Sequence, residues 1–250
     1  MGDTKIEWTD KTWNPVTGCS KVSAGCKFCY AERIFQRPYP GRVFTDLRIH
    51  TERLEQPLHW KNPCRIFVNS MSDLFHEGIP ADFIVQIFEV MAAAPRHTFQ
   101  ILTKRPERIK AVLFGEEGHF YLGGGDYYPH IWLGVSMEDQ STADERISSL
   151  LSVGWMGVNF ASYEPALGPV GFCRWLGKRD DLLPSIGWVI AGGESGPHAR
   201  PSEVSWYRSA RDECRQAGVP FFMKQLGGHP DKRGKLYDFP KDLRVRKFPH

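Results

Sequence analysis

The sequence predicts an α/β protein, a partial (β/α) barrel of six to seven parallel strands with helices outside. Short apolar, β-rich runs recur along the chain, helical stretches alternate with them, and the residues after the runs are unusually polar. Parallel strands joined by right-handed crossovers close into a full or partial barrel and gather functional groups at their carboxyl ends. We therefore expect two parts. Residues 1–226 form the barrel, including an N-terminal loop that carries three cysteines, and residues 227–250 form a basic tail.

Seven runs are candidate strands, because each is short, apolar and rich in β-branched or aromatic residues. They cover residues 12–17, 65–69, 98–103, 131–135, 157–162, 186–191 and 220–224. Helices are expected at 79–94, 106–113, 141–151 and 202–217. Pro80 and Pro106 lie in first turns, where proline is favourable, and Gly218 follows the last segment as a C-terminal cap.

Polar segments follow six of these strands and should meet at one edge of the sheet. They are residues 69–73, 103–105, 136–139, 162–165, 192–196 and 224–225. Two segments break the regularity. The glycine- and aromatic-rich segment 115–130 favours a surface excursion over a mobile lid, and the basic residues of the tail favour a solvated segment over a phosphate contact.

Composition restricts the class of protein only loosely. Hydrophobic residues make up 41% and charged residues 24%, and the net charge of +3 is well short of the bias of a chain built wholly for nucleic-acid binding. No run approaches about 18 uninterrupted apolar residues, and the N-terminus lacks the basic-then-apolar order of a signal peptide. We expect a cytoplasmic protein that does not enter the membrane.

Three of the six cysteines, Cys19, Cys26 and Cys29, lie on one short segment that also contains Gly18 and Gly25. Three thiolates on one loop hold three irons of a four-iron cluster and leave the fourth iron open for a ligand that reacts. In a reducing compartment this distribution favours metal binding over disulfides. The other three are expected to be small buried hydrophobes, with the last two in helices: Cys64, Cys173 and Cys214.

Two alternatives to the iron–sulfur cluster stay open, a zinc site and an unmetallated loop. Structural zinc normally has four ligands, but no second Cys-x-x-Cys exists and the nearest histidines are not spaced as a pair. The zinc alternative describes a zinc-stabilised nucleic-acid-binding protein without catalytic activity. Its stacking surface would combine the basic tail with aromatic side chains such as Trp132, Trp155 and Tyr121.

The cysteine segment resembles that of the radical S-adenosylmethionine (SAM) enzymes. Cys26-Lys27-Phe28-Cys29 matches the second half of their motif, although six residues rather than three separate the first two cysteines. Segments 70–73 and 101–104 resemble strand ends of the branch that contains spore photoproduct lyase. Together with residues 12–15, 29–33 and 192–196, they make the chain similar to a phage- and bacterium-encoded three-cysteine family of unassigned substrate.

The resemblance implies a [4Fe-4S] cluster on Cys19, Cys26 and Cys29, with SAM bound at the open iron. Reductive cleavage of SAM would give a 5′-deoxyadenosyl radical that removes hydrogen from unactivated carbon, so the difficult chemistry belongs to the cofactor. The resemblance also implies an external electron donor of the flavodoxin or ferredoxin type. A nucleotide or nucleic acid is the expected substrate class.

Further roles follow from the positions of residues at the strand ends. Phe28 would pack near the adenine of SAM or, alternatively, plug the core. The methionine ammonium would donate to Ser70, Ser72 and Asp73, and the methionine carboxylate would pair with Lys104 or Arg105. Ser136 and Glu138 would bind the ribose hydroxyls. Candidates that face the substrate are Tyr163, Glu164, Glu194, Lys224 and Gln225. A helix cap or a surface ion pair is the alternative for these polar groups.

Overall fold

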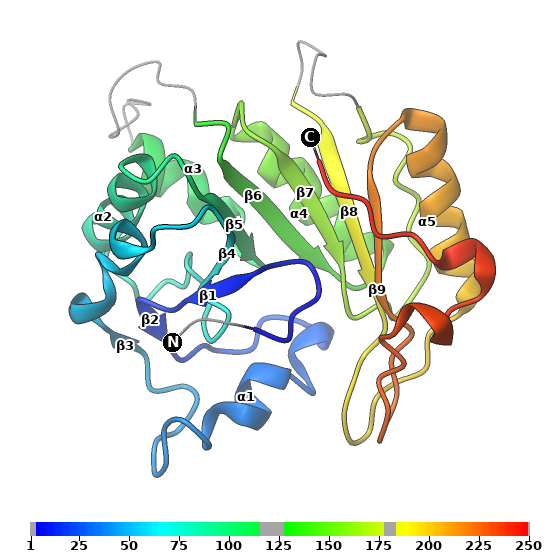
Figure 1. The fold of residues 1–250 in the computed structure, drawn as a ribbon, viewed down its shortest axis with the longest axis horizontal. Helices are drawn as coiled ribbons and strands as arrows, with labels where there is room; N and C mark the ends of the chain where they lie inside the picture. The colour runs from blue at the N-terminus through cyan, green and yellow to red at the C-terminus, as the bar shows by residue number, and fades with distance from the viewer. Residues whose placement is uncertain (1–3, 116–127, 178–183, 250) are drawn as a thin grey trace.

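The computed structural model describes residues 4–115, 128–177 and 184–249. Its main sheet has seven parallel strands in the order β1-β4-β5-β6-β7-β8-β9 and curls into a half-barrel (Figure 1). The strands are β1 (Lys11–Trp13), β4 (Arg65–Val68), β5 (Thr98–Thr103), β6 (Ile131–Met137), β7 (Asn159–Tyr163), β8 (Ile186–Gly192) and β9 (Phe221–Gln225). The predicted α/β partial barrel of parallel strands is confirmed.

The predicted strand at 12–17 divides into two strands that belong to different sheets. After β1, the chain leaves the main sheet at Asn14 and Pro15, and β2 (Val16–Thr17) pairs antiparallel with β3 (Arg48–Ile49). Proline lacks the N–H that a central strand needs. The Asn14 side chain accepts from Ser70 Oγ at 3.2 Å and from Met71 N at 3.0 Å, which ties the break to the end of β4.

In the described ranges, four helices of eight or more residues cover the outside of the half-barrel (Figure 1): α2 (Ala81–Ala92), α3 (Glu107–Phe114), α4 (Gln140–Ser152) and α5 (Val204–Ala217). Each lies within two residues of its predicted bounds. Asp139 caps α4 by accepting from Thr142 N at 2.9 Å, and Gly218 ends α5 with a φ of 71°. The shorter elements are α1 (Tyr30–Phe35), η1 (Ala24–Cys26), η2 (Thr51–Arg53), η3 (Gln56–His59), η4 (Leu236–Asp238) and η5 (Lys241–Leu243).

Side chains that alternate along the strands fill both faces of the sheet. One set packs against the helices, and the other forms an aromatic cluster on the concave face with Trp8 from the N-terminal segment. The Trp8 ring lies 4.7 Å from that of Phe67, centroid to centroid. Trp132 and Trp155 are buried as well, so they cannot form the stacking surface that the zinc alternative requires. Tyr121 lies outside the described residues.

The C-terminal segment packs against β8 and β9 (Figure 1), so the expectation of a solvated tail is wrong. Phe239 and Leu243 are buried, and the Trp188 indole N–H donates to the carbonyl of Lys247 at 2.9 Å. The guanidinium of Arg246 lies 5.3 Å from the centre of the Phe222 ring. The apolar residues interspersed among the basic ones explain the difference, because burying them stabilises the docked segment.

Two further expectations concern membrane insertion and the segment 115–130. No helix in the described ranges is long and apolar enough to cross a bilayer. The glycine run 123–125 and most aromatic residues of segment 115–130, on which the choice between a surface excursion and a lid depended, lie outside the described residues.

Candidate active site

A pocket lies between the carboxyl ends of the strands and the cysteine loop, which we define as residues 18–29. Cys19, Cys26 and Cys29 all line it. Its apolar floor includes Ile6, Trp8, Phe67 and Leu102. Polar lining residues come from the ends of six strands: Asn69, Ser70, Ser72, Asp73, Thr103, Lys104, Arg105, Ser136, Ser162, Glu164, Glu194, Ser195, Lys224 and Gln225.

The cysteines take three different backbone positions around the pocket. Cys19 follows Gly18, whose φ of 98° and lack of Cβ are required because a Cβ there would lie 2.6 Å from the Asp46 carbonyl oxygen. Cys26 ends η1, and Cys29 caps α1, where its carbonyl accepts from Arg33 N at 3.1 Å. All three thiols are free. The short helices therefore turn the loop so that its sulfur-bearing residues border one space.

The ligating side chains that border the pocket include three cysteines. Within the described ranges, no three His, Cys, Asp or Glu side chains are grouped closely enough to hold a metal ion. A tetrahedral zinc ion binds thiolate at about 2.3 Å and draws the sulfurs close together. In a four-iron cluster each thiolate binds a different iron, so the sulfurs lie further apart than around one zinc ion. The described lining of the pocket adds no fourth cysteine and no histidine.

Both Cys19 and Cys29 are neutral thiols at pH 7 in the absence of a metal. Burial raises the pKa of Cys19 to about 11, and the Asp73 carboxylate adds to this rise while Arg105 opposes it. Burial also raises the pKa of Cys29. Because metals bind thiolates, loading of the loop must release these protons and becomes more favourable as pH rises.

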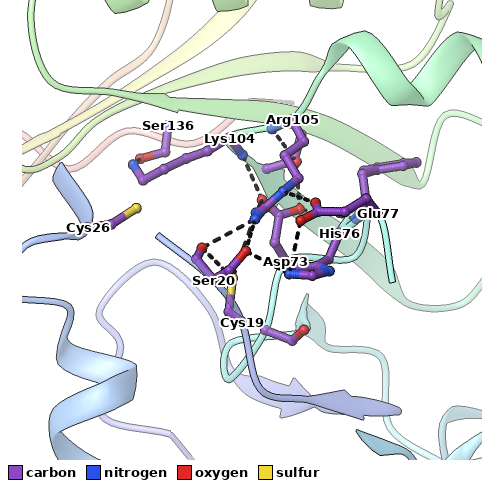
Figure 2. Close-up of polar contacts among 12 residues, drawn as sticks. Cys19, Ser20, Cys26, Asp73, His76, Glu77, Lys104, Arg105 and Ser136 are labelled. Atoms are coloured by element: carbon purple, nitrogen blue, oxygen red, sulfur yellow. Dashed lines mark hydrogen bonds and ion pairs between the residues drawn. The ribbon is translucent and has the colours of Figure 1, made fainter. Parts of the chain in front are cut away.

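Charged side chains from three distant parts of the chain hold the cysteine loop. Arg105, just after β5, donates to the carbonyl and hydroxyl of Ser20 (Figure 2). Glu138, after β6, accepts from Gly25 N at 3.0 Å. Arg200, in the loop after β8, donates to the carbonyl of Ala24 at 2.9 Å. Three of the six residues between Cys19 and Cys26, namely Ser20, Ala24 and Gly25, are thus held by residues that follow strands of the sheet.

Ser70, Ser72 and Asp73 line the pocket, but their side chains are bound within the chain. Ser72 Oγ donates to the Gly18 carbonyl at 2.7 Å. The buried Asp73 carboxylate accepts four hydrogen bonds, from the Thr103 hydroxyl, the Arg105 guanidinium and two backbone N–H groups. Its lone pairs are therefore occupied, and it braces the cysteine loop through Arg105 (Figure 2).

Lys104 and Ser136 lie together at the pocket, where the ammonium contacts the hydroxyl (Figure 2). Glu138 is not among the residues that line the pocket, and the expectation that it binds ribose stays a prediction. Its fully buried carboxylate, just past the end of β6, lies 3.0 Å from Arg146 Nη1 and 3.7 Å from Lys104 Nζ, and it accepts from Gly25 N of the cysteine loop. Arg105 has its donors engaged, and Lys104 Nζ, although 3.7 Å from the Glu138 carboxylate, borders the pocket as a candidate for an anionic group.

Four of the five residues expected to face the substrate line the pocket. Lys224 Nζ lies 2.6 and 2.8 Å from the two carboxylate oxygens of Glu164. The Gln225 amide donates to the Gly193 carbonyl, and Glu194 is paired with Arg200. Tyr163 is the exception. It is fully buried against Phe172 and Tyr207, because the alternation of β7 directs it to the helix-covered face, and the expectation for it is wrong.

Phe28 borders the pocket with its ring 5.9 Å from His198 and 5.5 Å from the guanidinium of Arg200. Sequence reasoning missed Arg200, which follows no strand directly and carries no motif. It also missed Tyr30, whose hydroxyl donates to the carbonyl of Ser70 at 2.9 Å. Of the single cysteines, Cys214 is buried as expected, but Cys173 is exposed in a turn. Cys64 is half-buried beside His97.

A family model described as a protein of unknown function, DUF5131, matches residues 3–246. The chain belongs to this family. No curated protein matches the DUF5131 chain. Among solved structures it is similar to a double mutant of spore photoproduct lyase with bound AdoMet and dinucleoside spore photoproduct, at a TM-score of 0.49 and 12% identity, over 96% of this chain and 64% of that one.

A second similar structure is spore photoproduct lyase complexed with dinucleoside spore photoproduct, at a TM-score of 0.46 and 11% identity. That match covers 87% of this chain and 64% of the other. The DUF5131 chain thus spans less than two thirds of the length of these lyase structures.

Proposed function

We propose that the protein is a radical SAM enzyme that holds a [4Fe-4S] cluster on Cys19, Cys26 and Cys29 and cleaves SAM reductively. One observation carries the proposal: the three cysteines, seven and three positions apart in sequence, border one pocket at the carboxyl edge of a parallel half-barrel. When bound, the cluster and SAM supply a 5′-deoxyadenosyl radical that abstracts hydrogen from the substrate.

The chain's own residues bind and orient SAM and shield the reactive carbon from water. Phe28 offers an aromatic face at the rim for the adenine, and Lys104 offers a cation for the carboxylate of the methionine moiety. Ser136, beside Lys104, offers a hydroxyl to the polar part of SAM. The apolar floor around Trp8 and Phe67 keeps water from a reactive carbon, which is what radical chemistry requires.

The opposite wall of the pocket holds the groups that we assign to the substrate. Glu164 and Lys224 form an ion pair there, with Gln225 and Glu194 beside them. Such a wall offers both hydrogen-bond donors and acceptors, which suits the edges of a nucleobase. We assign a nucleotide or nucleic acid as the substrate class, and a flavodoxin- or ferredoxin-like protein as the electron donor.

Anaerobic reconstitution with iron and sulfide tests the cofactor assignment directly. Wild-type protein should bind close to four irons and four sulfides per chain, show the electron paramagnetic resonance of a reduced [4Fe-4S] cluster with dithionite, and release 5′-deoxyadenosine from SAM. Cys19→Ala, Cys26→Ala and Cys29→Ala should each lose most of the iron and all of the product. Cys173→Ala is the matched control, because that thiol is exposed and lies outside the pocket.

Two results would contradict the proposal. One is stoichiometric zinc with no sulfide in protein purified without air. The other is a fully loaded cluster that yields no 5′-deoxyadenosine with SAM and a chemical reductant. Because a chemical reductant supplies the electron, this test does not depend on which protein is the natural electron donor.

A further inference from the structure

The Arg105 guanidinium contacts both the cysteine loop and the carboxylates of Asp73 and Glu77 (Figure 2). Its Nη1 lies 3.7 Å from Cys19 Sγ, and its Nη2 lies 2.8 Å from Ser20 Oγ and 3.2 Å from the Ser20 carbonyl oxygen. On the other side, Nη1 donates to Asp73 at 3.2 Å and Nε donates to Glu77 at 2.9 Å. All three guanidinium nitrogens are therefore engaged.

The surroundings fix the orientation of this guanidinium. Its side chain is only 6% exposed, and Asp73, itself buried, is held by Thr103 at 2.6 Å. A planar fork with five donors can satisfy two carboxylates, a hydroxyl, a carbonyl and a sulfur at once, whereas the point charge of a lysine cannot. The arrangement places a permanent positive charge against one of the three sulfurs proposed to bind iron.

We propose that Arg105 is a positioning residue that orients Cys19 and raises the reduction potential of the metal centre that this cysteine helps to hold. The inference rests on the proposed function. Hydrogen bonds to the sulfurs of an iron–sulfur cluster stabilise its reduced form, because reduction adds negative charge that the donors face. Groups that orient metal ligands commonly change metal affinity by about 10- to 100-fold when they are removed.

The protein without metal tests the positioning role. In Arg105→Gln, amides of residues 18–26 should exchange hydrogen several-fold faster than in wild type, measured by mass spectrometry on the full chain. Arg108→Gln is the matched control. Arg108 lies one turn further along and donates to the carbonyls of His76 and Ile79, with no contact to Cys19 among the described interactions. Unchanged exchange in Arg105→Gln would overturn the positioning role.

The protein reconstituted with iron and sulfide tests the effect on the reduction potential. A residue with a merely structural role would leave that potential unchanged. A redox titration followed by electron paramagnetic resonance should give a more negative midpoint for Arg105→Gln than for wild type, and a partly restored midpoint for Arg105→Lys. Loss of iron to a chelator should be about tenfold faster in Arg105→Gln. Arg108→Gln should match wild type in both. A wild-type midpoint in Arg105→Gln overturns the tuning role.

The hydrogen-exchange experiment and the redox titration together separate this inference from the proposed function. If wild-type protein binds no four-iron cluster, the proposed function fails and the tuning role fails with it, while hydrogen exchange still decides whether Arg105 holds the loop. If wild type binds the cluster and Arg105→Gln is unaltered in exchange and midpoint, the inference fails and the proposed function stands.

Discussion

The carboxylate of Glu138 accepts a hydrogen bond from the backbone N–H of Gly25 at 3.0 Å, across 113 positions of sequence. The same carboxylate is fully buried and paired with Arg146. A Cβ on Gly25 would lie 3.0 Å from the carboxyl carbon, so loop and carboxylate are in close contact. This contact joins the cysteine loop to the end of β6.

Glu138→Gln should therefore destabilise the protein. The substitution leaves the buried guanidinium of Arg146 without its charged partner, and breaking a buried pair costs about 3–5 kcal/mol. The free energy of unfolding, from urea titration, measures the loss. Glu145→Gln is the control, because Glu145 lies exposed on α4, the helix that carries Arg146, and should change stability little. Equal stability of Glu138→Gln and wild type would show that the pair contributes nothing net.

The stabilising effect of Glu138 should also depend on pH. Burial alone raises the pKa of this carboxyl, but the Lys104 and Arg146 charges and hydrogen bonds from the loop outweigh burial, so the pKa lies below its ordinary value of 4.5. A lowered pKa in the folded state stabilises the protein above the unfolded value and ceases to do so as pH falls through the folded value. The stability difference between wild type and Glu138→Gln should thus be constant near neutrality and shrink below pH 4.5. A difference that grows on acidification would contradict this.

Gly193→Ala should destabilise the pocket wall after β8. A Cβ at this position would lie 2.2 Å from the Leu226 carbonyl oxygen, so the backbone must move, and overpacking of this kind costs about 1–3 kcal/mol. Gly187→Ala, within β8 itself, is the matched control, because the nearest neighbour of its Cβ would be 3.8 Å away. Thermal unfolding followed by circular dichroism compares the two variants. Similar melting temperatures for both would refute the close approach.

Leu243→Ala should cost about 2–5 kcal/mol, although the residue lies in the C-terminal segment that the sequence assigns to a tail. Its side chain is fully buried, whereas that of Leu236 in the same segment is 43% exposed. Leu236→Ala should accordingly have a small effect on the unfolding free energy. A cooperative transition with unchanged stability in Leu243→Ala would mean that the segment does not contribute to the folded body.

Glu164 and Lys224 should be energetically coupled. Both are largely buried and their charged atoms lie 2.6 Å apart. Glu164→Gln and Lys224→Met should each destabilise, and the double variant should lose less than the sum, with a coupling energy of about 0.5–3 kcal/mol. Unfolding measurements on all four proteins complete the cycle. Strict additivity would show that water screens the pair.

Local patterns predict the strands of this chain well and its tertiary contacts poorly. Strand β5 has the predicted bounds, 98–103, because a β-rich run there is bounded by turn residues. Helix α1 escapes prediction since it has six residues and begins at a cysteine without a side-chain cap hydrogen bond. Its position depends on packing against Phe44 and Met71, which no local pattern encodes.

The candidate site could likewise be predicted from the sequence only in part. Parallel topology brings the strand ends together, so the polar segments after β4, β5 and β9 could be placed at the pocket in advance. The side to which each residue turns could not be known, because a shift of one position reverses it, and Tyr163 consequently faces away although Ser162 and Glu164 on either side of it line the pocket. Glu138 lies just past the end of β6, and its direction depends on its pairing with Arg146. Arg200 reaches the loop only because the segment after β8 folds back over it.

Three of the contacts that hold the cysteine loop also set an order on biosynthesis. The thiols leave the ribosome early, whereas their loop contacts Arg105, Glu138 and Arg200 over separations of 85, 113 and 176 residues. The Arg200 contact forms only after Arg200 itself, and with it β1 to β8, has been synthesised. We therefore expect the metal centre proposed for this loop to be completed late.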